Sequence, residues 1–135
     1  MSNTSLADCS ILICEDEPLI ALGIANAFSE AGARVVAVKS LARAFAAVEE
    51  DAPSAVILDH ALSDGESFQL CAYLKERHIP YVLHSGYPNH DDGAVSVPKP
   101  AAPQILVNVV EGLLGKLRTR LRSAVNSMPA ACGAW

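Results

Sequence analysis

The sequence predicts an α/β fold in which a parallel, doubly wound sheet is covered by helices on both faces. With 135 residues, 51% of them hydrophobic and 19% charged, the chain has the size and composition of one globular domain. Short runs of β-branched and apolar residues recur along it, and helical patterns lie between them. This alternation is typical of βαβ units, so we expect a single domain built around one parallel sheet.

Five runs are predicted to be strands. Four are clear and the last is weaker; in order they cover residues 11–14, 34–38, 55–58, 81–84 and 94–97. Before the last run, residues 85–95 are rich in turn-forming residues, and the segment is too short for a normal connecting helix. We therefore expect a loop at that position.

The first two helices carry start and stop signals. Glu17 is expected to cap the first helix, with Pro18 at its first position and Gly32 just past its end. Ser40 can cap the second helix, which Pro53 terminates. The side chains that these helices should turn toward the core are Ile20, Ile24, Ala27, Phe28 and Ala31 in the first, and Leu41, Phe45 and Val48 in the second.

Two further helices complete the pattern. The third is expected over 66–77, with Leu70, Cys71 and Leu74 facing inward, and the last runs from about 104 to 122. The chain ends show no periodic pattern, and we expect residues 1–7 and 127–135 to lack regular structure.

Composition excludes several classes of protein. The net charge of −5 disfavours a large nucleic-acid interface. The cysteines do not form a CxxC pair, which argues against a zinc or redox site, and reduced thiols fit a cytoplasmic location. No apolar run is long enough for a membrane span, and the first residues do not resemble a signal peptide, so we expect no membrane association.

Acidic residues gather at the predicted carboxyl edge of the sheet, where ligands bind in open parallel sheets. Glu15, Asp16 and Glu17 follow the first strand and Asp59 follows the third. Carboxylates at neighbouring strand ends repel one another, which predicts an oxygen-seeking cation. Mg²⁺ fits best because Zn²⁺ would want Cys or His ligands, and Mn²⁺ could substitute for it.

A hydroxyl and an ammonium group complete this edge. Ser85 follows the fourth strand and Lys99 follows the fifth. Together with a metal ion they could neutralise the oxygens of a phosphoryl group, which is the electrostatic work that phosphoryl transfer requires. Asp59 is then the candidate nucleophile.

Four short motifs follow one another along the chain: ILICEDE at 11–17, VILD at 56–59, LHSGY at 83–87 and PKP at 98–100. In this order they resemble the receiver domain of bacterial two-component response regulators. The resemblance covers residues 10–122, leaving tails at 1–9 and 123–135. It implies a flavodoxin-like sheet with strand order 2-1-3-4-5.

The resemblance also implies roles for individual residues. Glu15 and Asp16 match the metal-binding acidic pair, Asp59 the phosphorylated aspartate, Ser85 the switch hydroxyl and Lys99 the lysine of that family. The backbone carbonyl of Ala61, two residues after Asp59, matches the usual third protein ligand of the metal.

The chain departs from the family pattern in the switch region. The aromatic switch residue three positions before the lysine is replaced by Ser96, and only 14 positions separate Ser85 from Lys99. We therefore expect the fourth helix to be shortened or absent. The stretch 80–87 resembles single-domain receivers with a Phe-Ala-Thr-Gly-Tyr motif, with His84 and Ser85 in place of Ala-Thr. Tyr87 could gate access to the site.

The expected function is acceptance of a phosphoryl group on Asp59 from a sensor histidine kinase or a histidine phosphotransfer protein, followed by protein binding or phosphate relay. The alternative is an interaction module that is not phosphorylated. A magnesium-dependent phosphatase would need an acid where Ala61 stands, so we expect no enzyme of that kind. The sequence does not specify the cognate kinase, the target or the oligomeric state.

Three histidines lie near this edge in the sequence. His60 and His84 adjoin Asp59 and Ser85, but strand alternation should turn His84 into helix packing or solvent. The segment 90–92 could bind a second cation, although an exposed polar loop is the simpler interpretation.

Overall fold

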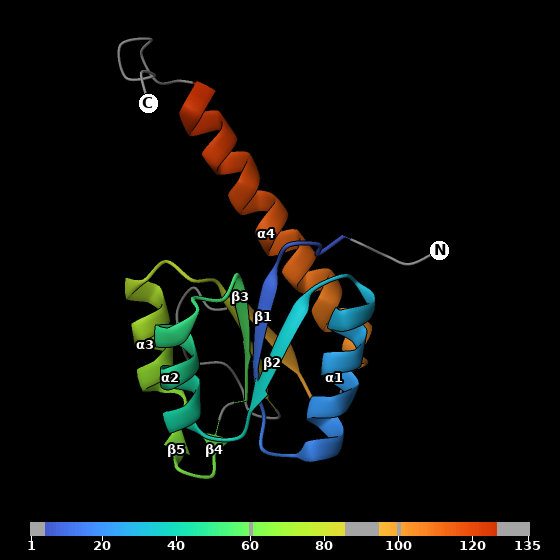
Figure 1. Cartoon of the computed structure of the whole chain (residues 1–135), viewed down its shortest axis with the longest axis vertical. Coiled ribbons are helices and arrows are strands. Elements are labelled where there is room, and N and C mark those ends of the chain that lie inside the picture. Colours follow the sequence, from blue (N-terminus) through green and yellow to red (C-terminus); the bar gives the residue numbers. More distant parts are fainter. Residues whose placement is uncertain (1–4, 60, 86–94, 100, 127–135) are drawn as a thin grey trace.

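The computed structural model describes residues 5–59, 61–85, 95–99 and 101–126, without the side chains of 61, 85 and 116–126. Helices and strands alternate along the chain (Figure 1). The strands are β1 (Ser10–Cys14), β2 (Arg34–Val38), β3 (Ala55–Leu58), β4 (Ala61–Leu62), β5 (Gly65–Glu66), β6 (Tyr81–Ser85) and β7 (Val95–Pro98). The helices in the described part are α1 (Pro18–Glu30), α2 (Leu41–Glu50), α3 (Phe68–Glu76) and α4 (Pro103–Asn126).

The five longer strands form one parallel sheet in the order β2-β1-β3-β6-β7. This confirms the predicted order 2-1-3-4-5 and the flavodoxin-like α/β class. After β2 at one edge, the chain continues on the other side of β1 with β3, so the strand order reverses between the neighbours β1 and β3. In such sheets ligands bind beyond the carboxyl ends of the two strands at this point.

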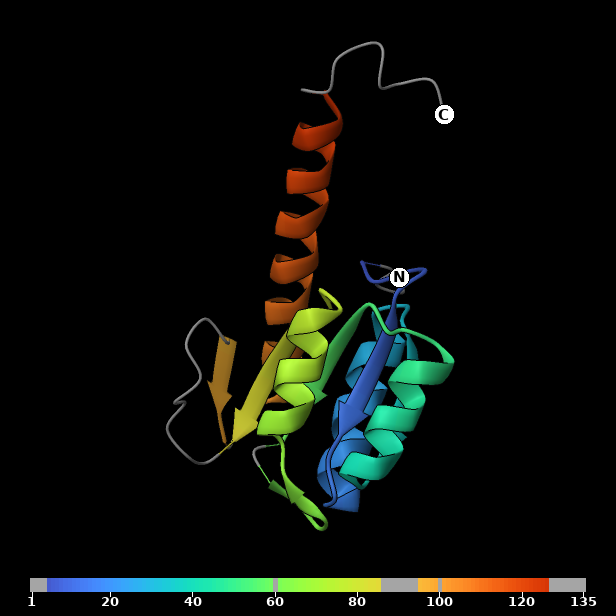
Figure 2. The same cartoon turned by 90° about the vertical axis from the view of Figure 1, so that its left-hand side faces the viewer.

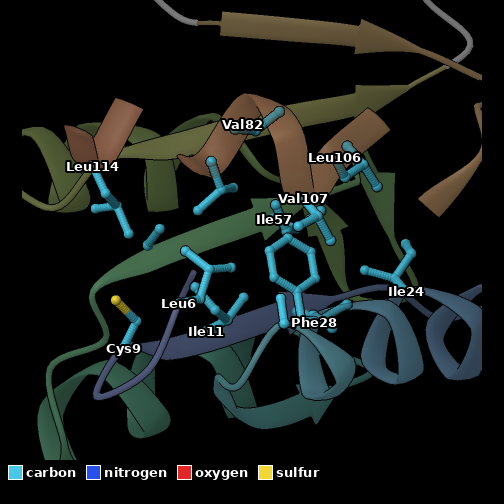
Figure 3. Close-up of a cluster of buried hydrophobic side chains, with 14 of the residues drawn as sticks. Leu6, Cys9, Ile11, Ile24, Phe28, Ile57, Val82, Leu106, Val107 and Leu114 are labelled. Atoms are coloured by element: carbon cyan, nitrogen blue, oxygen red, sulfur yellow. The ribbon is translucent and has the colours of Figure 1, made fainter. Parts of the chain in front are cut away.

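Helices cover the sheet on both faces, with α1 and α4 on one side and α2 and α3 on the other (Figure 1). Alternate strand residues supply the two cores: Ile11 and Ile13 face α1 and α4, whereas Leu12 and Cys14 face α2 and α3. Figure 3 shows the ring of Phe28, which is fully buried, directed toward Ile57 and Val107. The central strands β1 and β3 are therefore buried on both faces, whereas most residues of the edge strand β2 are exposed.

The segment before β1 corrects one expectation. Residues 1–9 are predicted to form a tail, yet the side chain of Leu6 is only 1% exposed and lies in the core beside α4 (Figure 3). The backbone N–H of Leu6 donates to the carbonyl oxygen of Ala31 at 2.9 Å. A single apolar residue has no periodicity to reveal its burial, so only the tertiary contact identifies this anchor.

The third predicted helix begins later than expected. Residues 66–77 are predicted to be helical, but Glu66 belongs to β5, which pairs with β4 in a small antiparallel hairpin that follows Asp59. The helix α3 starts at Phe68 and buries Leu70, Cys71 and Leu74 as predicted. Gly65, the first residue of β5 after the turn, has a φ of +144°, a conformation that favours glycine.

The other helices differ from prediction only in detail. The helix α1 begins at Pro18 and is followed by Gly32, as predicted. Glu17 occupies the N-cap position, but its side chain forms no capping hydrogen bond among the described residues, and Ile20 is 37% exposed instead of facing the core. In α2, the Ser40 hydroxyl accepts a hydrogen bond from the Arg43 backbone N–H at 3.2 Å, so the predicted cap is present.

The last helix, α4, continues four residues past the predicted end and runs to Asn126. Its first half packs against α1 and the sheet, and the remainder extends away from the sheet in both views (Figures 1 and 2). Over the described part of the chain, no helix has the length and apolar character needed to cross a membrane.

Nine residues, 86–94, connect β6 to β7 and lie outside the described residues. The expectations for this connection, namely a loop with helix 4 shortened or absent and a gating role of Tyr87, therefore fall outside the description. His60 and the segment 90–92 also lie outside it.

Candidate functional site

Three carboxylates meet at the carboxyl edge of the sheet. Glu15 and Asp16 directly follow β1, and Asp59 directly follows β3, which is the neighbour of β1. One carboxylate oxygen of each residue lies within 4.8 Å of those of the other two. The predicted acidic cluster is thus formed because two central parallel strands end side by side.

The three acids differ in exposure. Glu15 is only 3% exposed, Asp59 is half-buried and Asp16 is exposed. A carboxylate oxygen of Glu15, Oε2, also accepts the backbone N–H of Glu17 at 3.3 Å, which orients the Glu15 side chain at the start of α1. The cluster therefore has a buried side held by the protein and a side open to solvent.

Lys99 joins the cluster from the end of β7, the strand at the other edge of the sheet from β2. Its Nζ donates to Glu15 Oε1 at 2.8 Å and to Asp59 Oδ2 at 3.1 Å. Lys99 follows β7, and β6 lies between β7 and β3, so the lysine side chain passes the end of β6 to reach both acids. The predicted pairing of Lys99 with Asp59 is present, and the shorter contact, with Glu15, is an addition to the prediction.

Burial and pairing act in opposite directions on these groups. Burial raises the pKa of Glu15, and the neighbouring Asp59 adds to this, while the hydrogen bond from Lys99 lowers it; the net result is a raised pKa. Burial alone would lower the pKa of Lys99, but the hydrogen bonds to Glu15 and Asp59 outweigh it and raise the pKa. The lysine therefore stays cationic. Its single positive charge cannot neutralise three carboxylates.

The donor set fits a hard divalent cation. Three carboxylates with one ammonium leave excess negative charge, and carboxylate oxygens are the ligands that Mg²⁺ takes most readily in proteins. No cysteine or histidine of the described residues joins the group, so a site for a softer metal is not formed there.

Other predicted site residues occupy the same edge. Ser85 is the last residue of β6 and is in register with Pro98, the neighbour of Lys99. Ser96 lies in β7, where it pairs with Leu83. Ala61 begins β4, two residues after Asp59, and its part as a metal ligand stays a prediction. The role of Ser85 as the switch hydroxyl also stays a prediction.

An acid outside the cluster holds the hairpin that follows Asp59. The carboxylate of Asp64 accepts the backbone N–H groups of Leu41 at 2.8 Å and Ala42 at 3.1 Å, at the start of α2. These two hydrogen bonds lower the pKa of Asp64. The sequence Ser-Asp-Gly at 63–65 signals a turn, but the partner helix lies 22 residues earlier and could not be inferred from it.

His84 is buried behind the site. It is 4% exposed, and neither ring nitrogen has a hydrogen-bond partner among the described residues. Burial lowers the pKa of its imidazole, and the charge of Lys99 lowers it further, while Asp59 opposes them. Of the two predicted environments, helix packing or solvent, the burial of His84 excludes solvent.

Comparisons with known proteins agree with this geometry. The family model described as "Response regulator receiver domain" matches residues 11–110. A response regulator receiver protein from Sinorhizobium medicae WSM419 is 25% identical, with a TM-score of 0.72 over 79% of this chain and 94% of that chain. A two-component response regulator from Clostridium difficile is 21% identical, with a TM-score of 0.73 over 82% of this chain and 98% of the other.

A third structure, the receiver domain of the Francisella response regulator 1452, is 17% identical, with a TM-score of 0.73 over 82% of this chain and 99% of that one. No curated protein sequence matches the chain. At such low identity, structural similarity indicates the fold alone. The family match covers most of the chain, including the acidic edge.

Proposed function

Because this chain belongs to the response regulator receiver domain family, whose members serve two-component signalling, we propose that Asp59 accepts a phosphoryl group from a histidine kinase or histidine phosphotransfer protein. We expect this exchange in the cytoplasm, with the phosphorylated chain signalling through protein binding or passing the phosphoryl group on. The chain would act as a phosphoacceptor and not as an enzyme with a substrate of its own.

The observation that supports this proposal is the position of the Asp59 carboxylate. It stands at the end of a central strand, its side chain is 15% exposed, and one of its oxygens is held by the Lys99 ammonium. A carboxylate that is partly accessible and oriented by a cation is suited to attack an incoming phosphorus atom.

The proposed transfer balances as a displacement at phosphorus. An oxygen of Asp59 forms the new O–P bond while the N–P bond of the donor phosphohistidine breaks, and the departing imidazole nitrogen keeps the electron pair. The Lys99 ammonium lies 3.1 Å from the Asp59 oxygen, so it is close enough to bind a phosphoryl oxygen after transfer.

The residues that would hold Mg²⁺ are Glu15, Asp16 and Asp59, with the Ala61 carbonyl as a proposed further ligand. The bound cation, or Mn²⁺ in its place, would neutralise charge on the transferred phosphoryl group. The ammonium of Lys99 already contacts Glu15 and Asp59, so it competes with a cation for these oxygens. We therefore expect Lys99→Ala to bind Mg²⁺ at least as tightly as the parent, measured by calorimetry.

The direct test is the intact mass of the protein after incubation with acetyl phosphate and Mg²⁺. We expect the parent to gain one phosphoryl group and Asp59→Asn to gain none, because the amide lacks the nucleophilic oxygen but keeps the shape of the side chain. A matched control is Asp51→Asn, which alters an exposed aspartate at the end of α2 and should be phosphorylated like the parent.

Omission of Mg²⁺ should reduce uptake strongly in both the parent and the control. Uptake by Asp59→Asn equal to that of the parent would show that another residue is the acceptor. A parent that gains no phosphoryl group from either acetyl phosphate or a histidine phosphotransfer protein would support the alternative, an unphosphorylated interaction module.

A further inference from the structure

Among the described strands, the outer edge of β2 has no pairing partner. The strand β2 is the last in the sheet, with β1 on one side and no described strand on the other. Figure 1 shows β2 between α2 and α1 with no described helix or strand in front of it. Natural sheets usually protect such edges with a proline, a bulge or charged residues. Within β2 the only charged residue is Arg34, at its first position.

The direction of the free backbone groups follows from the pairing with β1. The N–H of Arg34 donates to Cys9 and the carbonyl of Val38 accepts from Glu15, so residues 34, 36 and 38 face β1. Successive residues of a strand direct their backbone groups to opposite sides, so the N–H and C=O groups of Val35 and Ala37 point away from the sheet.

A groove runs beside this edge. It has a volume of about 630 Å³ and lies between β2 and α2, with Val36, Val38, Ala46 and Ala47 among its lining residues. The side chain of Val36 is 51% exposed there, although valine is a residue that strands normally bury. The edge therefore offers both free hydrogen-bonding groups and apolar surface.

The two ends of the groove carry opposite charge. Since α2 follows β2 and runs back along it, the start of α2 lies near the end of β2, and the end of α2 lies near the start of β2. Lys39 and Arg43 are at the first of these ends, whereas Glu50 and Asp51 are at the second. All four side chains are exposed.

We propose that this edge is a self-association surface, on which a second copy of the chain pairs its own β2 antiparallel about a two-fold axis at Val36. Val35 of one copy would then exchange backbone hydrogen bonds with Ala37 of the other, and the two Val36 side chains would meet. The same axis brings the basic end of each groove to the acidic end of the other. A second copy is thus complementary to this edge in backbone hydrogen bonding and in charge.

Charge reversal tests the proposal by analytical ultracentrifugation of the full chain between about 1 µM and 1 mM. Lys39→Glu and Glu50→Lys should each weaken self-association by about tenfold, because each replaces attraction by repulsion at two symmetric positions. An equimolar mixture of these two variants should associate as well as the parent, because each variant then meets its opposite charge.

A backbone variant tests the pairing independently of charge. Ala37→Pro removes an N–H that points outward and leaves the groups that face β1 in place, so it should abolish dimers while the far-UV circular dichroism stays that of the parent. The matched control Ala37→Val keeps the N–H and should dimerise. Asp59→Asn should dimerise as well, because this inference does not depend on the proposed phosphorylation.

Two results would overturn the proposal. A parent that stays monomeric up to about 1 mM would leave this edge free for a strand of another protein. A dimer unaffected by Ala37→Pro, or a mixture of the charge variants that stays monomeric, would place the interface elsewhere on the molecule.

Discussion

Replacing His84 by leucine should stabilise this protein. The imidazole is 4% exposed, and its two nitrogens have no hydrogen-bond partner among the described residues. An unsatisfied buried polar group costs roughly 1–3 kcal/mol, and an apolar side chain of similar size removes that cost. We therefore expect His84→Leu to raise the free energy of unfolding by about 1–3 kcal/mol at neutral pH.

The gain should depend on pH with a definite sign. Burial, and then the charge of Lys99, lower the pKa of His84 in the folded protein below its ordinary value of 6.5. The unfolded chain therefore binds a proton before the folded one does, and the parent loses stability as pH falls below 6.5. The leucine variant lacks this loss, so its advantage over the parent should grow as the solution is acidified.

Urea unfolding followed by circular dichroism, at several values between pH 8 and pH 5, measures both effects. The control His78→Gln replaces an exposed histidine at the end of α3 instead of a buried one. A leucine variant that is less stable than the parent, or an advantage that does not change with pH, would refute the reasoning. Either result would mean that the imidazole of His84 is not an unsatisfied buried group in the folded protein.

Three further substitutions test the packing and the caps. Leu6→Ala should lower the free energy of unfolding by about 2–5 kcal/mol in urea unfolding, because it empties a buried site; a change near zero would show that this segment does not belong to the core. His78→Gly should raise the melting temperature by relieving a φ of +58°, worth about 0.5–1 kcal/mol; a lower melting temperature would contradict this. The pKa of Asp64 is lowered in the folded protein, so Asp64→Asn should reduce the free energy of unfolding above the ordinary pKa of 3.8. The variant should also lose less stability than the parent as the pH falls. Urea unfolding that shows the same loss at acid pH in both proteins would count against the hydrogen bonds from Asp64 to the start of α2.

Much of the fold could be predicted because its signals are local. The apolar runs, the Pro18 start and the Ser40 cap are properties of a few neighbouring residues, and the strands and helices follow from them. The acidic edge was also predictable, since residues that follow neighbouring parallel strands must meet at one end of the sheet.

The errors have a common cause in contacts between distant segments. Leu6 is buried because α4 and the end of α1 lie over it, and Ile20 is exposed because no described element covers that side of α1. The hairpin of β4 and β5 replaces the first turn of the predicted third helix because Asp64 satisfies the N–H groups at the start of α2. None of these contacts leaves a periodic signal in the sequence.

By itself, the sequence determines the α/β class, the strand order through its family resemblance, and the chemical types that reach the carboxyl edge of the sheet. Only the tertiary structure decides how those groups pair. Lys99 binds Glu15, 84 residues away, as well as Asp59, and His84 is buried without a partner among the described residues. The physical reason is that hydrogen bonding, desolvation and charge depend on distances of a few ångströms, and these exist only once separate strands lie side by side.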